Sequence, residues 1–438
     1  MDTPQLTPAE TSQSNRSHME ILELEEMRLR LNNASPEYID VSNKLARLLF
    51  RIDPEQAVSI ADQSIALARS IDHLPGLAKA YTALSHAQLS MSRYTAARHS
   101  ANKAIQLFIH LGENLGLLDA NNALGISYDT SGEYEKALEI FLRNEEIARE
   151  LGETRMQGKS LNNIACILFD QGNYSGALEY FMRAYECTQE LQDPEETGIA
   201  LLNIGVIHLE LGHLDEALEY LTHSLECISS IPEAVSGVQL NLSQYHKKAR
   251  NTEKALEFGI RCLEGYQRIN NPHGIIGSLR NLGEIYLQQK ELDKACYYFE
   301  EALKLARDKN EKTLQAENQL LLGRAHVRKA QPDTAIRMLK KVFRFEKNYK
   351  SCVYEAHQEL ALAYEQKEDY QSALKHHKEY ARIKNLLFNQ QSDQKMQSLR
   401  IIFQLEQAER EARLLKQKNE ELAQTNKTLA QLAEQQKR

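Results

Sequence analysis

One pattern recurs along most of the chain at intervals of about forty residues. The segment from Gly125 to Leu138 returns from Ala165 to Leu178 and again from Gly205 to Leu218. In each copy a small residue is followed twelve residues later by Ala. That second position is occupied by Ala57, Ala97, Ala137, Ala177, Ala217, Ala255, Ala295, Ala335 and Ala373. A fixed period of this length indicates one supersecondary unit that buries its apolar surface only against neighbouring copies.

The residues inside each unit predict a helix, a turn and a second helix. Two closely crossing helices need small side chains where their backbones meet, which explains the paired small positions. Gly132, Gly172 and Gly212 lie five residues before the Ala, where a left-handed residue ends a helix. Pro54 and Pro332 lie three before it, in the first turn of the next helix. The sequence therefore predicts an all-α superhelical solenoid of nine helix–turn–helix units.

This order of small residue, turn Gly, Tyr and Ala resembles the tetratricopeptide repeat in its longer form of about forty residues. The resemblance covers about residues 38–386. The first unit is degenerate, because its small residue Ala46 lies eleven residues before Ala57 instead of twelve. Arg250 and Ala330 stand where turn glycines are expected. The resemblance implies stacked helical hairpins whose first helices line a concave binding surface.

Composition narrows the classes of function. The chain has 53 Lys and Arg against 61 Asp and Glu, so its net charge of −8 disfavours nucleic acid as a partner. No apolar run approaches the roughly 18 residues that a membrane helix needs, and residues 1–16 do not form a secretory signal. Six isolated Cys suit a reducing compartment. We expect a cytoplasmic protein without membrane contact.

Asparagines recur on the face of the first helices that is expected to line the groove. Amides can both donate to and accept from the backbone of an extended peptide. In related arrays, including those of kinesin light chains and of carboxylate-clamp cochaperones, Asn at this place contacts peptide. The alternative is that these amides bond neighbouring helices and orient the stack. The candidates are Asn122, Asn162, Asn163, Asn203, Asn241 and Asn281.

Charge on the same face changes sign along the chain. Asp129, Asp170 and Glu210 come early, and a basic group comes later. Such a gradient orients a ligand and speeds its capture. The basic residues are interpreted either as a recognition patch for an acidic peptide or as solvated helix charges. They are Lys247, Lys248, Arg280, Arg324 and Arg328.

No arrangement of residues predicts catalysis. His208, His246 and His326 each lie three residues after the first small residue, where other repeats carry Tyr, so they are expected to pack. They are at least one repeat apart and cannot converge on one metal ion. His376 and His377 are expected to be exposed, without a partner at ligand spacing. Hydrolase, metalloprotease, phosphate-loop and dinucleotide motifs are absent from the sequence. We expect no enzyme activity, no catalytic residue, no metal and no cofactor.

The last fifty residues carry a different pattern. Apolar positions alternate in steps of four and three, which predicts a parallel two-stranded coiled coil with Asn at two successive a positions to fix its register. A lone solvated helix is the alternative. The expected organisation is a disordered tail over 1–17, the solenoid over 18–386 and the coiled coil over 387–438. The expected dimerisation residues are Ile401, Leu405, Leu415, Asn419, Leu422, Asn426 and Leu429.

These features predict a non-enzymatic, homodimeric scaffold or sensor that binds a protein segment or peptide in its groove. An array joined to a heptad rod also resembles the input half of bacterial signalling proteins, in which the rod leads to a diguanylate or adenylate cyclase or a histidine kinase. The alternative interpretation is therefore the regulatory portion of such an enzyme, with a catalytic domain beyond Arg438. The sequence does not identify the partner.

Overall fold

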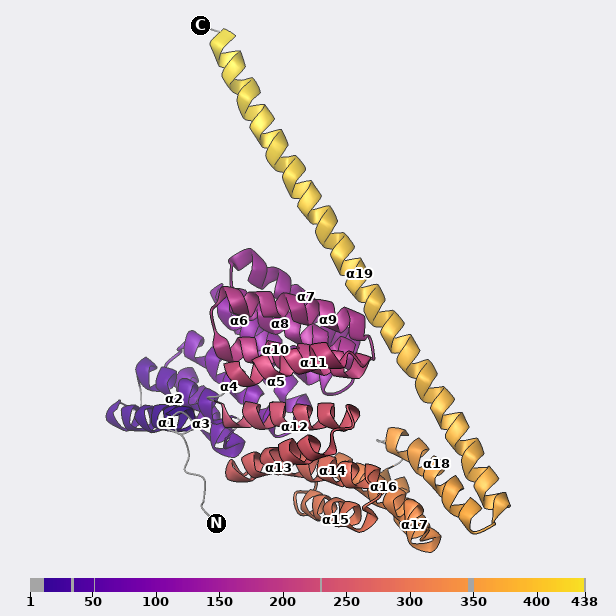
Figure 1. The fold of residues 1–438 in the computed structure, drawn as a ribbon. Helices are drawn as coiled ribbons and strands as arrows, with labels where there is room; N and C mark the ends of the chain where they lie inside the picture. The colour runs from indigo at the N-terminus through magenta and orange to yellow at the C-terminus, as the bar shows by residue number, and fades with distance from the viewer. Residues whose placement is uncertain (1–11, 33–34, 51, 229–230, 346–349, 437–438) are drawn as a thin grey trace.

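The solenoid consists of helical hairpins stacked in chain order. The computed structural model describes residues 12–436 except 33–34, 51, 229–230 and 346–349. Within these residues one helix, α1 (Ser12–Arg30), precedes nine hairpins (Figure 1). The hairpins are α2 (Pro36–Leu49) with α3 (Pro54–Ser70), α4 (Leu74–Ser90) with α5 (Tyr94–Leu111), α6 (Asn114–Asp129) with α7 (Tyr134–Leu151), α8 (Thr154–Asp170) with α9 (Tyr174–Glu190), α10 (Pro194–Leu211) with α11 (Leu214–Cys227), α12 (Pro232–Lys248) with α13 (Thr252–Arg268), α14 (Pro272–Gln288) with α15 (Leu292–Asp308), α16 (Lys312–Arg328) with α17 (Pro332–Leu339), and α18 (Lys350–Gln366) with α19 (Tyr370–Gln436). A short 3-10 helix, η1 (Val342–Phe345), follows α17.

The turns within the hairpins use the left-handed conformation that the repeat predicts. Gly132, Gly172 and Gly212 have φ of 75°, 69° and 81°. Arg250 and Ala330 adopt the same conformation, with φ of 58° and 53°. The geometry of the turn is therefore kept where the glycine is lost, at the steric cost that a Cβ atom adds there.

The small residues lie where the two helices of a hairpin cross, as predicted. A Cβ atom added to Gly125 would lie 2.5 Å from Cε1 of Phe141 on the partner helix. The same distance separates a Cβ at Gly283 from Cε1 of Phe299. Phe141 and Phe299 are almost completely buried, so each aromatic ring fills the space that the glycine leaves. Interiors packed to this density do not tolerate an extra methyl group without movement.

The inner wall of the solenoid is formed by the first helices of the hairpins. Successive first helices contact one another, as α4 contacts α6 and α6 contacts α8. Among the described residues no two successive second helices pack to this extent. The hairpins are therefore wedged closer together on the side of the first helices, which makes that side concave.

The two ends differ in detail from the expected domain limits. Helix α1 starts at Ser12, so residues 12–17 are helical although they were expected to belong to a disordered tail. Residues 1–11 lie outside the described residues. At the other end α19 continues from the last hairpin through residue 387 without a break. The last repeat and the rod are thus one helix.

Candidate functional site: the concave face of repeats three to five

Two amide pairs connect the first helices of repeats three, four and five. Nδ2 of Asn163 on α8 donates to Oδ1 of Asn122 on α6 at 2.7 Å. Nδ2 of Asn203 on α10 donates to Oδ1 of Asn162 on α8 at 2.8 Å. All four side chains are only partly buried. The asparagines therefore form a ladder across three repeats, in which each pair joins neighbouring helices.

This ladder retains capacity for a ligand. A primary amide has two donor hydrogens and two acceptor lone pairs, and each pair uses one donor and one acceptor. Orientation of the stack and contact with a peptide are therefore compatible roles for these four residues. The two interpretations drawn from the sequence do not exclude each other.

The asparagines of the next two repeats are engaged differently. Asn241 donates to the backbone oxygen of Gly237 on its own helix at 3.0 Å. Asn281 is 3% exposed and donates to Oγ of Ser243 at 2.6 Å. Asn281 is thus placed to join α14 to α12, and it does not present its amide to the groove.

Two carboxylates stand beside the ladder without a counter-charge. Asp129 at the end of α6 is partly buried, and Asp170 at the end of α8 is exposed. Burial, together with the nearby charge of Asp170, raises the pKa of Asp129 to about 6. Partial desolvation also raises the pKa of Asp170, although this residue is exposed at the concave face. No Lys or Arg of the described residues forms an ion pair with either carboxylate.

A small hollow adjoins Asp170. Its volume is about 120 Å³, and its walls combine apolar surface with one carboxylate and one amide. The lining residues are Cys166, Phe169, Asp170, Phe181, Asn203 and Val206. Burial raises the pKa of the Cys166 thiol to about 12, and the two aspartates contribute, so this thiol is protonated and unreactive at neutral pH.

The basic residues further along the groove are mostly paired within the chain. Lys247 bonds Glu284 at 2.5 Å, and Lys248 bonds Glu210 at 3.1 Å. Arg280 pairs with Glu317. These partners lie one repeat away, on the neighbouring first helix.

Of the two remaining basic residues, Arg324 is paired within the chain and Arg328 is not. Arg324 bonds Glu359 at 2.7 Å and Glu355 at 2.8 Å. Arg328 is exposed and forms no ion pair with another described residue. The cations therefore mainly connect successive helices, and their charge is neutralised there. The acidic partners lie 31 to 38 positions from their cations, so a search of the sequence at about one repeat length would have found these pairs.

The long helix α19 returns to the solenoid at repeats three and four, where it packs against α7 (Figure 1). Nε2 of Gln171, which caps α8, donates to Oγ of Ser398 at 2.8 Å. Both side chains are buried, at 7% and 1% exposure. Ile402 is buried in the same apolar cluster as Leu138 and Phe141, and Ile401 packs against it. A contact between residues 227 positions apart was not predicted from the sequence.

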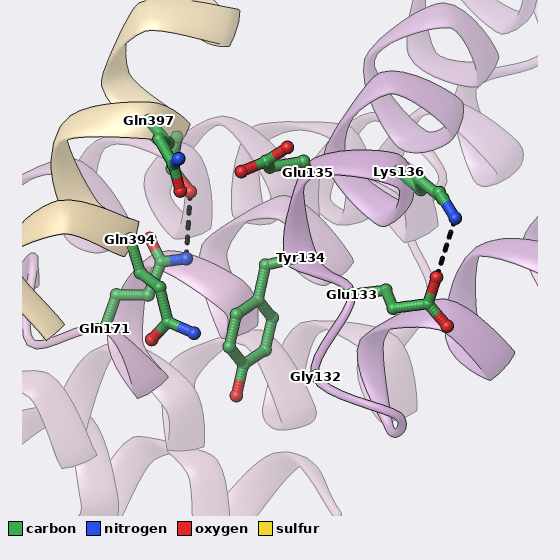
Figure 2. A pocket seen from close by; sticks show the side chains of 9 residues that line it. Gly132, Glu133, Tyr134, Glu135, Lys136, Gln171, Gln394 and Gln397 are labelled. Atoms are coloured by element: carbon green, nitrogen blue, oxygen red, sulfur yellow. Dashed lines mark hydrogen bonds and ion pairs between the residues drawn. The ribbon is translucent and has the colours of Figure 1, made fainter. Parts of the chain in front are cut away.

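A cleft of about 190 Å³ lies between α19 and the start of α7 (Figure 2). Gln394 and Gln397 enter it from α19, and Tyr134, Glu135 and Gln171 face it from the solenoid. Glu133 and Lys136 at its side bond each other at 2.8 Å. Most of the residues that line it are Glu, Lys or Gln, and much of the exposed lining comes from the carbon atoms of these side chains and of Tyr134.

The expected dimerisation residues fall into two groups. Ile401 packs on the solenoid, and Leu405 is 38% exposed just beyond the contact. Leu415 and Leu422 are 61% and 60% exposed, and Asn419 and Asn426 are exposed as well. The side chain of Leu429 lies outside the described side chains.

The histidines act in packing. His208 stacks on Tyr220, and His246 stacks on Phe258, as their repeat positions predict. The expectation for His376 is wrong, because its ring stacks on Tyr364 and its Nδ1 lies 2.8 Å from Nδ1 of His357. His376 faces back into the last hairpin, a direction that the sequence spacing does not show. Among the described residues no group of three or more His, Cys, Asp or Glu is gathered to hold a metal ion.

Comparison with known proteins gives the family of the repeat. The family model "Tetratricopeptide repeat" matches residues 156–230, 235–308 and 274–347. No curated protein matches the sequence. None of the described helices has the length and hydropathy required to cross a bilayer.

Several solved structures share the fold at low identity. A Rap protein complexed with Competence and Sporulation Factor superposes with a TM-score of 0.57 at 13% identity, covering 81% of this chain and 99% of that one. The apo quorum sensor NprR from B. thuringiensis gives 0.57 at 14% identity, with 79% and 99% covered. Aspartyl phosphate phosphatase F from Bacillus subtilis gives 0.53 at 12% identity, with 80% and 94% covered.

Arrays of this kind present extended concave surfaces on which other proteins bind, so the architecture is that of a protein-interaction scaffold. The family model and the solved folds agree with the stacked helical hairpins of this structure. Residues 156–230 and 235–347 therefore match tetratricopeptide repeats, and the described residues form helical hairpins stacked as a solenoid of this type, followed by a long C-terminal helix.

Proposed function

We propose that the concave face of repeats three to five binds an extended protein segment that carries a basic residue. The observation on which the proposal rests is the pair Asp129 and Asp170, which lies beside the asparagine ladder without an ion-pair partner among the described residues. Holding two carboxylates close together in a desolvated place costs stability, and a cation supplied by a ligand removes that cost.

The shape of the hollow specifies the ligand further. Phe169, Phe181 and Val206 offer apolar contact to a methylene chain, and Asp170 stands at the same hollow. A Lys or Arg side chain has this division between an apolar stem and a charged end. Asn163 and Asn203 each use one amide hydrogen in their bonds to Asn122 and Asn162, so the other can donate to the backbone of the same segment. A basic ligand thus fits this face better than the acidic one considered from the sequence.

Two structural neighbours are compatible with a sensor role. One is a Rap protein complexed with Competence and Sporulation Factor, and another is a quorum sensor. At 13% and 14% identity they support the fold alone, so the ligand proposed here is argued from this chain's own residues.

Selection from a random peptide library tests the site. We expect Lys or Arg to be enriched in peptides retained by the wild-type protein, and the enrichment to be lost in the double variant Asp129→Asn, Asp170→Asn. The control is Glu210→Gln, since Glu210 occupies the place of Asp170 one repeat further on but is paired with Lys248. Basic peptides retained equally by all three proteins would refute the site, as would a wild-type selection without basic residues.

We further propose that α19 pairs with a second copy through the part of its heptad seam that projects from the solenoid. Leu415 and Leu422 expose most of their surface, and the seam between them carries Asn419. A parallel pair of helices would bury these leucines at d positions and pair the asparagines at a.

Mass measurement by light scattering tests the dimer on the full chain. We expect the wild type to be dimeric and the variant Leu415→Lys, Leu422→Lys to be monomeric. Leu414→Lys is the matched control, because Leu414 is 54% exposed but lies off the seam. A monomeric wild type, or equal masses for all forms, would end the proposal.

A further inference from the structure

The contact between α19 and the solenoid involves the same helix face as the coiled-coil seam. The seam includes Ile401 at d and Leu405 at a. Seven residues earlier, the same two heptad positions are occupied by Gln394 and Ser398. Gln394 lines the cleft against α7, Ser398 bonds Gln171, and Ile401 packs on the apolar cluster of α7 to α9. The seam thus faces the solenoid over this stretch.

The contact is confined to that face. Met396, Leu399 and Phe403 point to other sides of α19 and are 67%, 41% and 62% exposed. Ile402, which flanks the seam, is 8% exposed. Figure 1 shows α19 projecting beyond the solenoid. On this projecting part Leu415 and Leu422 are open to solvent.

The docked stretch is held by a specific contact. The bond between Gln171 and Ser398 is a buried polar pair next to an apolar contact, and such a pair fixes the register of a helix better than apolar packing alone. Oε1 of Gln171 is buried and has no hydrogen-bond partner in the described part of the chain. The contact therefore fixes where α19 docks but leaves one buried acceptor without a hydrogen bond. This unsatisfied acceptor weakens the docked state, as expected of an interface that can separate.

We infer that the edge of the solenoid at Gln171 holds the seam face of residues 394–402 and thereby prevents this stretch from joining the coiled coil. Two paired helices lie about 8–10 Å apart, and on the seam side of α19 that space is filled by α7. Docking and pairing of residues 394–402 exclude each other. The inference rests on the proposed dimerisation through α19.

The two states give the solenoid control over the length of the coil. While the helix is docked, only the projecting part of the seam can pair. When it is released, Ser398 and Ile401 add to the same seam. Any change that weakens the contact between Gln171 and α19 allows a longer coiled coil and lowers the dissociation constant of the dimer, because the docking and pairing equilibria are linked.

The variant Gln171→Lys in the full-length protein tests this competition. It places a charge in the buried contact and leaves the sequence of α19 unchanged. The control is Leu211→Lys, which changes the corresponding position of repeat five, where the side chain is 37% exposed. Hydrogen exchange of residues 394–402, measured at a concentration where the chain is monomeric, reports docking. Sedimentation over a range of concentrations gives the dimer dissociation constant.

For Gln171→Lys we expect exchange of residues 394–402 to become at least ten times faster and the dissociation constant to fall at least tenfold. Leu211→Lys is expected to change neither. Faster exchange with an unchanged dissociation constant would overturn the competition, and unchanged exchange would show that the edge does not hold the helix.

If Gln171→Lys loses its helical signal, the variant Ile402→Lys disrupts the same contact from α19, with Phe403→Lys as its exposed control. If all these proteins stay monomeric at every concentration, α19 does not form a coiled coil, and the proposed competition is refuted for that reason. Hydrogen exchange would then still show whether α19 is docked, so the two failures are distinguishable.

Discussion

The carboxyl group of Asp129 should lower the stability of the free protein at neutral pH. Its pKa is raised from 3.8 to about 6 by burial and by Asp170, so ionisation is harder in the folded chain than in the unfolded one. Below pH 3.8 the group is protonated in both states and imposes no cost. As the pH rises toward and beyond 6, the unfolded state ionises first, and the folded state loses stability relative to it.

The variant Asp129→Asn removes this ionisation while keeping the shape of the side chain. A shift of about two pKa units corresponds to about 3 kcal/mol, and screening by solvent at a partly exposed carboxyl reduces it to about 1–2 kcal/mol. We therefore expect the variant to be more stable than the wild type by about 1–2 kcal/mol at pH 7.5. The gain should shrink steadily as the pH is lowered to 4.5.

Urea denaturation followed by circular dichroism at several pH values measures this difference. The control Glu210→Gln changes an exposed carboxylate that pairs with Lys248 and should alter stability by no more than about 1 kcal/mol, in the destabilising direction. A variant no more stable than the wild type at pH 7.5 would refute the reasoning. A gain that does not depend on pH would do so as well, because it would not come from ionisation.

Three further predictions concern the fold. Arg250→Gly and Ala330→Gly should each raise the free energy of unfolding by about 0.5–1 kcal/mol, because both residues adopt positive φ; lower urea midpoints would contradict this. Gly125→Ala should destabilise by about 1–3 kcal/mol by forcing Phe141 to move, whereas Gly277→Ala, with no atom within 4 Å of its Cβ, should be neutral or stabilising by thermal melting. Asn144→Ala should cost about 1–3 kcal/mol because it removes a fully buried amide whose Nδ2 donates to the carbonyl of Leu118 at 3.0 Å. The exposed Asn102→Ala serves as the comparison, and equal losses would show that burial is not the cause.

The repeat could be predicted from the sequence because it depends on local geometry. The positions of Gly132 and Pro54 determine where one helix ends and the next begins, and small residues such as Gly125 determine where helices cross. Even where Arg250 replaces glycine, the surrounding period is enough to identify the turn.

The return of α19 to α7 could not be predicted in the same way. The curvature of a solenoid is the sum of small rotations between repeats, and single-residue patterns do not give these rotations. Ser398 and Gln171 look like ordinary polar residues in the sequence, and only their burial shows that they meet. The pairing of Arg280 with Glu317 is an intermediate case, because the partner lies one repeat away and a search at that spacing finds it.

The unbroken course of α19 makes the C-terminal segment a lever. From Ser398 to Gln436 the helix extends about 57 Å at 1.5 Å per residue. If the stack of repeats tilts this helix by about 10° at the solenoid edge, the far end moves by about 10 Å. A small adjustment among the hairpins is thereby converted into a displacement as wide as a helix.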